Sequence, residues 1–182
     1  YTTKNIFVSN NEHNSNEILE GTTANLSWVY DGTISEYQVL VGTTNPPTDI
    51  VQDWTEAAGT DGSLEYSLEQ QNVKYYWQVK VRNNEETAES SILSFVSLKR
   101  PEVNPVANLY PGSNDAQAST TISWKEITGA SYKIYYGNEV IDVESTSYEL
   151  SGLSYNNGEA NKMTVAAVYD GLGESFGTEV NI

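Results

Sequence analysis

The sequence contains no cysteine, and its 182 residues include one histidine, one methionine and nine lysine or arginine residues. Without cysteine, the chain can form no disulfide bond, thiolate metal site or cysteine nucleophile. It also has no run of 18 consecutive apolar residues, so no membrane-spanning helix is expected. These shortages predict a protein that carries no cofactor and does not insert into a membrane.

Positive charge is scarce along the whole chain. The nine cationic residues stand against 25 Asp or Glu residues, which gives a formal net charge of −16. An acidic surface repels phosphate backbones and anionic lipid head groups, because binding to both depends on clustered Lys and Arg. We therefore expect neither nucleic acid nor a membrane surface as a partner. High solubility by itself also explains such a surface.

Residues suited to catalysis are few and scattered. His13, the only histidine, lies in the polar stretch NNEHNSNE, which is typical of a solvated loop. No GxSxG motif marks a nucleophile elbow. Asp31 and Asp61 each precede a glycine without a second acid two positions away, a pattern that favours tight turns over calcium loops. The sequence therefore predicts no enzyme, no catalytic residue and no metal site.

Two segments of the chain resemble one another. LSWVYDGTISEYQVLVG begins at Leu26, and ISWKEITGASYKIYYG begins at Ile122. Each has a tryptophan at the end of a strand-like run, Trp28 in the first and Trp124 in the second, followed by a turn and an aromatic alternation. The tryptophans are 96 residues apart, since 124 minus 28 is 96. This is the size of one small β-sandwich, so the repeat predicts two such domains in tandem.

Short runs of alternating apolar residues recur throughout both halves. The run of Tyr75, Trp77 and Val79 is the clearest example, and turn clusters such as DGT and GTDG separate the runs. Seven short runs of this kind can be counted in each half, and no segment has the pattern of a long amphipathic helix. We predict an all-β fold of two tandem seven-stranded immunoglobulin-like β-sandwiches.

The domain boundaries follow from the repeat and from two prolines. We expect one domain over 1–98, a linker over 99–105 and a second domain over 106–182. Pro101 and Pro105 within the linker favour an extended, semi-rigid connection.

Several of these residues resemble the marker residues of fibronectin type III domains, especially the bacterial form found in exported and surface proteins. Trp28 and Trp124 match the family's B-strand tryptophan, and Tyr37 and Tyr132 match its C-strand tyrosine. The segment YQVLVGTTNPP, which begins at Tyr37, and the region around Tyr75 also follow the family's pattern. The resemblance covers nearly the whole chain twice and implies the sandwich fold, but it implies no activity.

The resemblance also implies a core and a corner. Tyr75 is the candidate for the tyrosine corner, in which a hydroxyl group ties a strand connection to the backbone. In the second half Asn161 stands where Tyr75 stands in the first, which predicts a looser corner there. The expected core residues are Trp28, Tyr37, Tyr75, Trp77, Phe95, Trp124 and Tyr132.

Trp54 is the one tryptophan that the core pattern does not include. It lies in the polar segment VQDWTEAAGTDG. An exposed tryptophan beside polar groups is how many sugar-binding modules present a flat surface for a sugar ring, so Trp54 is a candidate ligand contact. The other interpretation is a lid that folds over the edge of the core.

The function expected from these observations is non-catalytic. We interpret the chain as a spacer or protein-interaction module of an exported or cell-surface multidomain bacterial protein. Its partners would be other domains of the same protein or another surface protein. The alternative is a carbohydrate-binding accessory module with a glycan partner. The chain starts at Tyr1 and its only methionine is Met163, so we expect a processed product or a fragment.

Overall fold

The computed structural model describes residues 4–10, 17–106, 118–153 and 161–182. His13 and Leu109 lie outside the described residues. The chain divides into two compact units, unit 1 from Tyr1 to Ser97 and unit 2 from Leu98 to Ile182. Both consist of β-strands, so the prediction of an all-β fold with two tandem immunoglobulin-like sandwiches is confirmed. The described residues include no helix long and apolar enough to cross a membrane.

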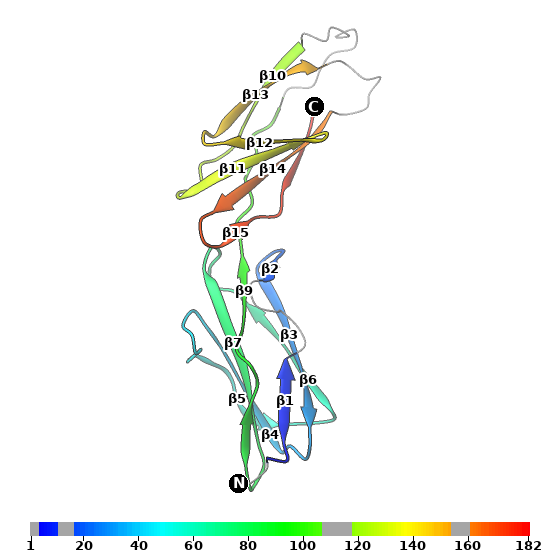
Figure 1. Ribbon diagram of the computed structural model, residues 1–182, viewed down its shortest axis with the longest axis vertical. Helices are drawn as coiled ribbons and strands as arrows, with labels where there is room; N and C mark the ends of the chain where they lie inside the picture. The colour runs from blue at the N-terminus through cyan, green and yellow to red at the C-terminus, as the bar shows by residue number, and fades with distance from the viewer. Residues whose placement is uncertain (1–3, 11–16, 107–117, 154–160) are drawn as a thin grey trace. The chain divides into compact units, whose positions relative to one another are not determined.

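Unit 1 has all seven strands expected from the sequence and two further short ones, β2 and β8. In chain order they are β1 (Phe7–Asn10), β2 (Glu17–Leu19), β3 (Thr23–Asp31), β4 (Glu36–Gly42), β5 (Ile50–Glu56), β6 (Asp61–Ser67), β7 (Lys74–Arg82), β8 (Thr87–Glu89) and β9 (Leu93–Ser97). One sheet has the order β1-β3-β6 and the other β2-β9-β7-β4-β5, with β8 paired to β7 (Figure 1). The strands β5 and β6 are therefore edge strands of different sheets.

Alternation along the strands places one face of each sheet in the core of unit 1. In β3, Leu26 and Trp28 are fully buried while Ser27 between them is only partly buried. Trp77, Phe95 and Tyr75 are buried as well, and Tyr37 is partly buried against the same cluster. A sheet face of this kind buries every second side chain, which is why the spacing of the apolar residues could be read from the sequence.

Trp28 is held between the two sheets. Its ring centroid lies 5.4 Å from that of Tyr37, and the indole has no exposed surface. Gly62 on β6 pairs directly with Trp28 on β3, and a Cβ atom at this glycine would collide with the indole nitrogen. The absence of a side chain at residue 62 is therefore what gives the indole its space.

Tyr75 lies at the connection between β6 and β7. Its hydroxyl oxygen accepts a hydrogen bond from the Gln70 amide at 3.3 Å and lies 3.4 Å from the Gln70 carbonyl oxygen. The Phe95 ring stacks on the Tyr75 ring at 5.6 Å between centroids. The loop is thereby tied to a buried side chain. The equivalent connection in unit 2 precedes Asn161 and falls outside the described residues.

Unit 2 repeats this plan with one strand fewer in each sheet among the described residues. Its strands are β10 (Ala118–Ser123), β11 (Ala130–Tyr136), β12 (Glu139–Val143), β13 (Ser147–Leu153), β14 (Lys162–Tyr169), β15 (Gly173–Glu174) and β16 (Thr178–Asn181). The strands β10 and β13 form one sheet, and β12-β11-β14-β15 with β16 form the other. Trp124 and Tyr132 are both buried, with ring centroids 5.2 Å apart. The tryptophan–tyrosine pair of unit 1 is thus repeated.

The segment 99–105, expected from the sequence to be a linker, carries hydrogen bonds into unit 2. Val103 forms a β-bridge with Trp124, and the Lys125 amide donates to the Glu102 carbonyl at 3.0 Å. Further along, the Thr178 hydroxyl donates to the Pro101 carbonyl at 2.7 Å. The sequence predicted a first strand of the second domain around Val106, and in the structure the bridge to Trp124 is formed by Val103 instead. Several backbone groups of the segment 99–105 are thus hydrogen-bonded to unit 2.

We predict that Gly62→Ala destabilises unit 1 while Ser63→Ala, one residue further along the same strand, does not. The methyl group at residue 62 has to displace the indole of Trp28, and overpacking of this kind costs about 1 to 3 kcal/mol. Ser63 is exposed, so its change should alter the free energy of unfolding by less than about 0.5 kcal/mol. Urea unfolding followed by tryptophan fluorescence measures both. Equal midpoints for Gly62→Ala and the wild type would contradict the packing described for Trp28.

Candidate interaction site

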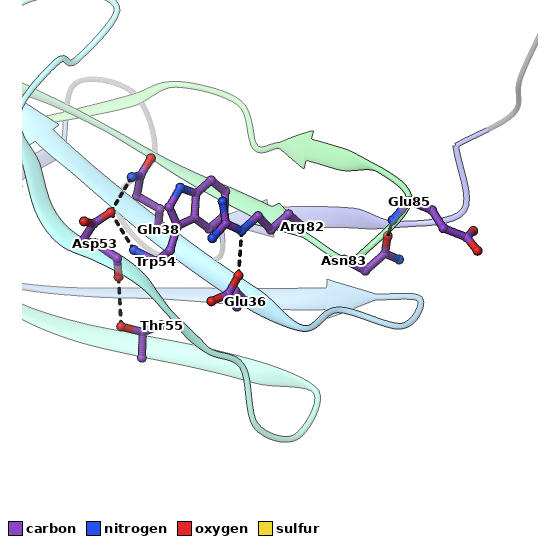
Figure 2. A network of polar contacts seen from close by, with 8 residues as sticks. All are labelled: Glu36, Gln38, Asp53, Trp54, Thr55, Arg82, Asn83 and Glu85. Carbon is purple, nitrogen blue, oxygen red and sulfur yellow. Dashed lines mark hydrogen bonds and ion pairs between the residues drawn. The ribbon is translucent and has the colours of Figure 1, made fainter.

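The candidate site lies on the outer face of the larger sheet of unit 1. Val39 on β4 and Val81 on β7 belong to the core, so their neighbours Gln38 and Arg82 face away from it. Glu36 pairs with Arg82 in the register of these two strands. Trp54 on the edge strand β5 completes the group, which Figure 2 shows from close by.

A β-bulge in β5 sets the position of Trp54. Tyr37 pairs with Thr55 and Val39 pairs with Gln52, so two residues of β5, Asp53 and Trp54, lie opposite one residue of β4. Bulges are common on edge strands, where they redirect side chains and interrupt the edge that another strand could join. Here the bulge turns the indole toward the outer face of the sheet.

Asp53 stabilises the bulge. One of its carboxylate oxygens accepts hydrogen bonds from the Trp54 amide at 2.8 Å and from the Gln38 side-chain amide at 3.0 Å. These two bonds, first that of Trp54 and then that of Gln38, lower the pKa of the Asp53 carboxyl below its usual value because they favour the charged form. Gln38 is itself buried, which fixes the donor in place.

The Arg82 guanidinium lies over the ring of Trp54. Its Cζ atom is 4.1 Å from the ring centroid, within the range of a cation–π interaction. The Arg82 Nε atom also donates to a Glu36 carboxylate oxygen at 2.6 Å (Figure 2). Three neighbouring strands, β5, β4 and β7, are therefore joined by side chains on this face.

This arrangement differs from both interpretations of Trp54 offered by the sequence. The indole is not among the residues packed against the core of unit 1, so it does not act as a lid over the core edge. It is partly exposed on the outer face, but one ring face is occupied by a guanidinium. The structure thus presents a tryptophan–arginine pair in place of a bare aromatic surface.

The sequence analysis did not identify Arg82 or Glu36 as part of this site. Alternation from Val81 would have placed Arg82 on the outer face of the sheet. Alternation alone could not have placed Arg82 beside Trp54. The two residues are 28 positions apart in the sequence, 82 minus 54, and β4 lies between their strands in the sheet.

The corresponding face of unit 2 is built differently. Tyr132 pairs with Ala167 as Tyr37 pairs with Val81, so Ser131 and Val168 occupy the positions of Glu36 and Arg82. No ion pair or cation–π pair can form between those two side chains. A shallow hollow of about 410 Å³ is found here instead; its lining residues are Gly129, Ala130, Ser131, Glu144, Val168 and Asp170.

A second polar group marks the outer face of unit 2. The Tyr135 hydroxyl donates a short hydrogen bond to Glu174, and the other Glu174 oxygen lies 4.0 Å from the Lys133 Nζ atom. The bond to Glu174, followed by burial, raises the pKa of Tyr135 to about 12. The hydroxyl is therefore protonated at neutral pH and acts as a donor that joins β11 to β15.

The candidate site suits binding better than catalysis. Its charged groups are already engaged, Arg82 with Glu36 and Asp53 with the Gln38 side chain and the Trp54 amide. The described residues contain no group of three His, Cys, Asp or Glu side chains placed to hold a metal ion. Tryptophan and arginine are the residue types most enriched among those that dominate protein–protein binding energy. The geometry is that of a fixed polar and aromatic surface.

We predict that Arg82→Gln lowers the free energy of unfolding of unit 1 by about 1 kcal/mol, because it removes the cation–π contact and a half-exposed ion pair. Lys80→Gln is the matched control, since it removes the same charge from the same strand face. It should change stability by a few tenths of a kcal/mol, about the median for exposed charges. A double-mutant cycle with Trp54→Leu measures the contact itself. A coupling energy of zero would contradict the stacked geometry.

No protein-family model matches this chain. No curated protein matches it either. Among solved structures, it is similar to a two-domain fibronectin type III segment from chicken tenascin, with 13% identity, a TM-score of 0.47 and 97% of both chains covered. It is also similar to the FN1–FN3 domains of chicken CNTN1, with 13% identity, a TM-score of 0.32, and coverage of 96% of this chain and 63% of that one. A chimeric titin Z1Z2–Z1Z2 tandem has 11% identity and a TM-score of 0.37, with 92% of this chain and 93% of that chain covered.

Proposed function

We propose that this chain is a non-catalytic module of an exported or cell-surface multidomain protein, in which it spaces other domains and contacts a protein partner. The observation that carries the proposal is the presence of two separate buried cores. Trp28 with Tyr37 lies at the centre of one, and Trp124 with Tyr132 at the centre of the other. A chain with two cores of its own can fold as two independent bodies.

The contact role is supported by the outer face of unit 1. Trp54 and Arg82 contact each other there in a fixed arrangement, because Asp53 binds the Trp54 amide and Glu36 binds the Arg82 guanidinium. A partner that binds this face does not have to order these side chains, and preorganised groups lose less entropy on binding. The equivalent positions of unit 2 carry Ser131 and Val168, so the two units offer different surfaces on a shared scaffold.

The spacer role is tested by stretching the 182-residue chain between a surface and a force probe. We expect two separate unfolding events, each releasing about 300 Å of chain, since each unit has roughly 85 to 97 residues and an extended residue spans about 3.6 Å. Trp28→Ala should lower the force of one event and Trp124→Ala that of the other. A single event that releases the whole chain would overturn the proposal, and so would a loss of both events in either variant.

The carbohydrate-binding alternative depends on Trp54, whose indole remains at the surface and outside the core. For a sugar ring to stack on it, the free face of the indole or a displaced Arg82 would be required. Titration of soluble glycans against tryptophan fluorescence, with Trp54→Ala as control, tests this directly. A saturable change that the variant loses would establish sugar binding. We expect no saturable change, because the guanidinium already occupies the ring.

A further inference from the structure

A second surface feature of unit 1 lies on the side where its two sheets come to an end. A hollow of about 340 Å³ opens between the start of β5 and the end of β6, and we call it the β5–β6 hollow. Because β5 and β6 are edge strands of different sheets, none of the strands among residues 4–10 and 17–97 closes the sandwich on this side. The residues that matter for its chemistry are Asp49, Ile50, Tyr66, Glu69 and Tyr75.

The inner wall of the hollow is aromatic. The rings of Tyr66 and Tyr75 meet edge to face, with centroids 5.9 Å apart and an interplanar angle of 66°. Tyr75 is buried and its hydroxyl is bound to the Gln70 backbone, so this wall is fixed. Ile50, which is 54% exposed, adds an apolar side chain at the rim. A flat organic group or an alkyl stem would find matching surface here.

The charge around the hollow is entirely negative. Asp49 and Glu69 both line it, and none of its lining residues is a lysine or arginine. Within the described part of the chain, neither carboxylate has an ion pair or a side-chain hydrogen bond. Burial raises the pKa of the Tyr66 hydroxyl, and Tyr75, then Glu69 and Asp49, raise it further. Both carboxylates therefore lie near enough to the Tyr66 hydroxyl to raise its pKa.

The part of the acidic rim that contains Asp49 is held by backbone contacts. The Val41 amide donates to the Asp49 carbonyl at 3.0 Å, and the Thr44 hydroxyl donates to the Pro46 carbonyl at 3.0 Å in the loop between them. A Cβ atom on Gly42 would lie 3.0 Å from the Asp49 carboxylate, so that carboxylate rests against the glycine backbone. A ligand would meet a largely preformed site.

We propose that the β5–β6 hollow binds an arginine side chain presented by a partner protein. A guanidinium is planar and stacks on tyrosine, it donates to carboxylates in a fork, and its alkyl stem packs on apolar surface. The planar guanidinium matches the aromatic wall, its N–H groups match the two carboxylates, and the alkyl stem matches Ile50. The chain's net charge of −16 also attracts a basic partner from a distance. The proposal rests on the contact role proposed above and names the chemistry of the partner.

Unit 2 supplies an internal comparison. Ala24 pairs with Tyr66 in unit 1, and the matching residue Thr120 pairs with Leu150 in unit 2. Leucine therefore stands where the hollow has its tyrosine. The variant Tyr66→Leu brings the residue of unit 2 into unit 1 and removes one of the two rings of the aromatic wall while it leaves an apolar side chain.

The test uses the whole 182-residue chain at low salt, with N-acetyl-arginine methylamide as the probe and its neutral citrulline analogue for comparison. Backbone amide NMR shifts report where each compound binds. We expect saturable shifts with the arginine probe that are confined to residues 41–51 and 66–75. The citrulline analogue should produce none, because it has the same shape without the charge.

Two double variants with equal charge decide whether the hollow is responsible. Asp49→Asn with Glu69→Gln should weaken binding of the arginine probe at least tenfold, whereas Asp31→Asn with Glu85→Gln, away from the hollow, should leave it within twofold. Tyr66→Leu should weaken it about three- to tenfold. Equal weakening by the two double variants, or shifts spread over the acidic surface, would overturn the proposal. Two force-induced unfolding events would remain in either case, so the spacer role is judged separately.

Discussion

The structure depends above all on the packing of one indole between two sheets in each unit. Trp28 has no exposed surface, lies against Tyr37 and is accommodated only because Gly62 has no side chain. Trp124 and Tyr132 repeat the contact in unit 2. The indole nitrogens of Trp28, Trp77 and Trp124 have no hydrogen-bond partner among the described residues, so burial of the large rings has to outweigh that cost. The alternation of side chains along each strand decides which residues face inward, and the buried tryptophan fills the space between the two sheets.

The two units share this interior but not their outer faces. An interior residue has to fit its neighbours closely, whereas an outward residue on the same strand is free to vary. Unit 1 uses that freedom to stack Arg82 on Trp54 across β4, and it uses a bulge in β5 to bring Trp54 into position. Unit 2 places Val168 and Ser131 at the equivalent points and leaves a shallow hollow. Residues 102 and 103, which precede β10, bond to residues 124 and 125 and thus belong to unit 2.

The surface of unit 1 combines two kinds of feature with opposite character. On the Trp54–Arg82 face, Arg82 is paired with Glu36, and Asp53 accepts hydrogen bonds from Gln38 and the Trp54 amide. The β5–β6 hollow has carboxylates without a cation beside an aromatic wall. Paired charges mainly rigidify a surface, whereas unpaired charges of one sign select the sign of a partner. A protein whose function lies in its surface can thus vary its binding properties without any change to the cores that keep it folded.

The repeat, the all-β class and the alternation of inward-facing residues can be predicted from the sequence alone. Alternation with a period of two is a local property, and the 96-residue offset between Trp28 and Trp124 is visible in the chain. The tertiary structure alone decided which distant side chains meet. Arg82 reaches Trp54 because β7, β4 and β5 lie side by side, and the hollow exists because β5 and β6 end different sheets. The hydrogen bonds that attach residues 101–104 to unit 2 are likewise contacts between residues far apart in the sequence. Contacts between side chains on different strands depend on the order of the strands in the sheet, which the local pattern of residues does not encode.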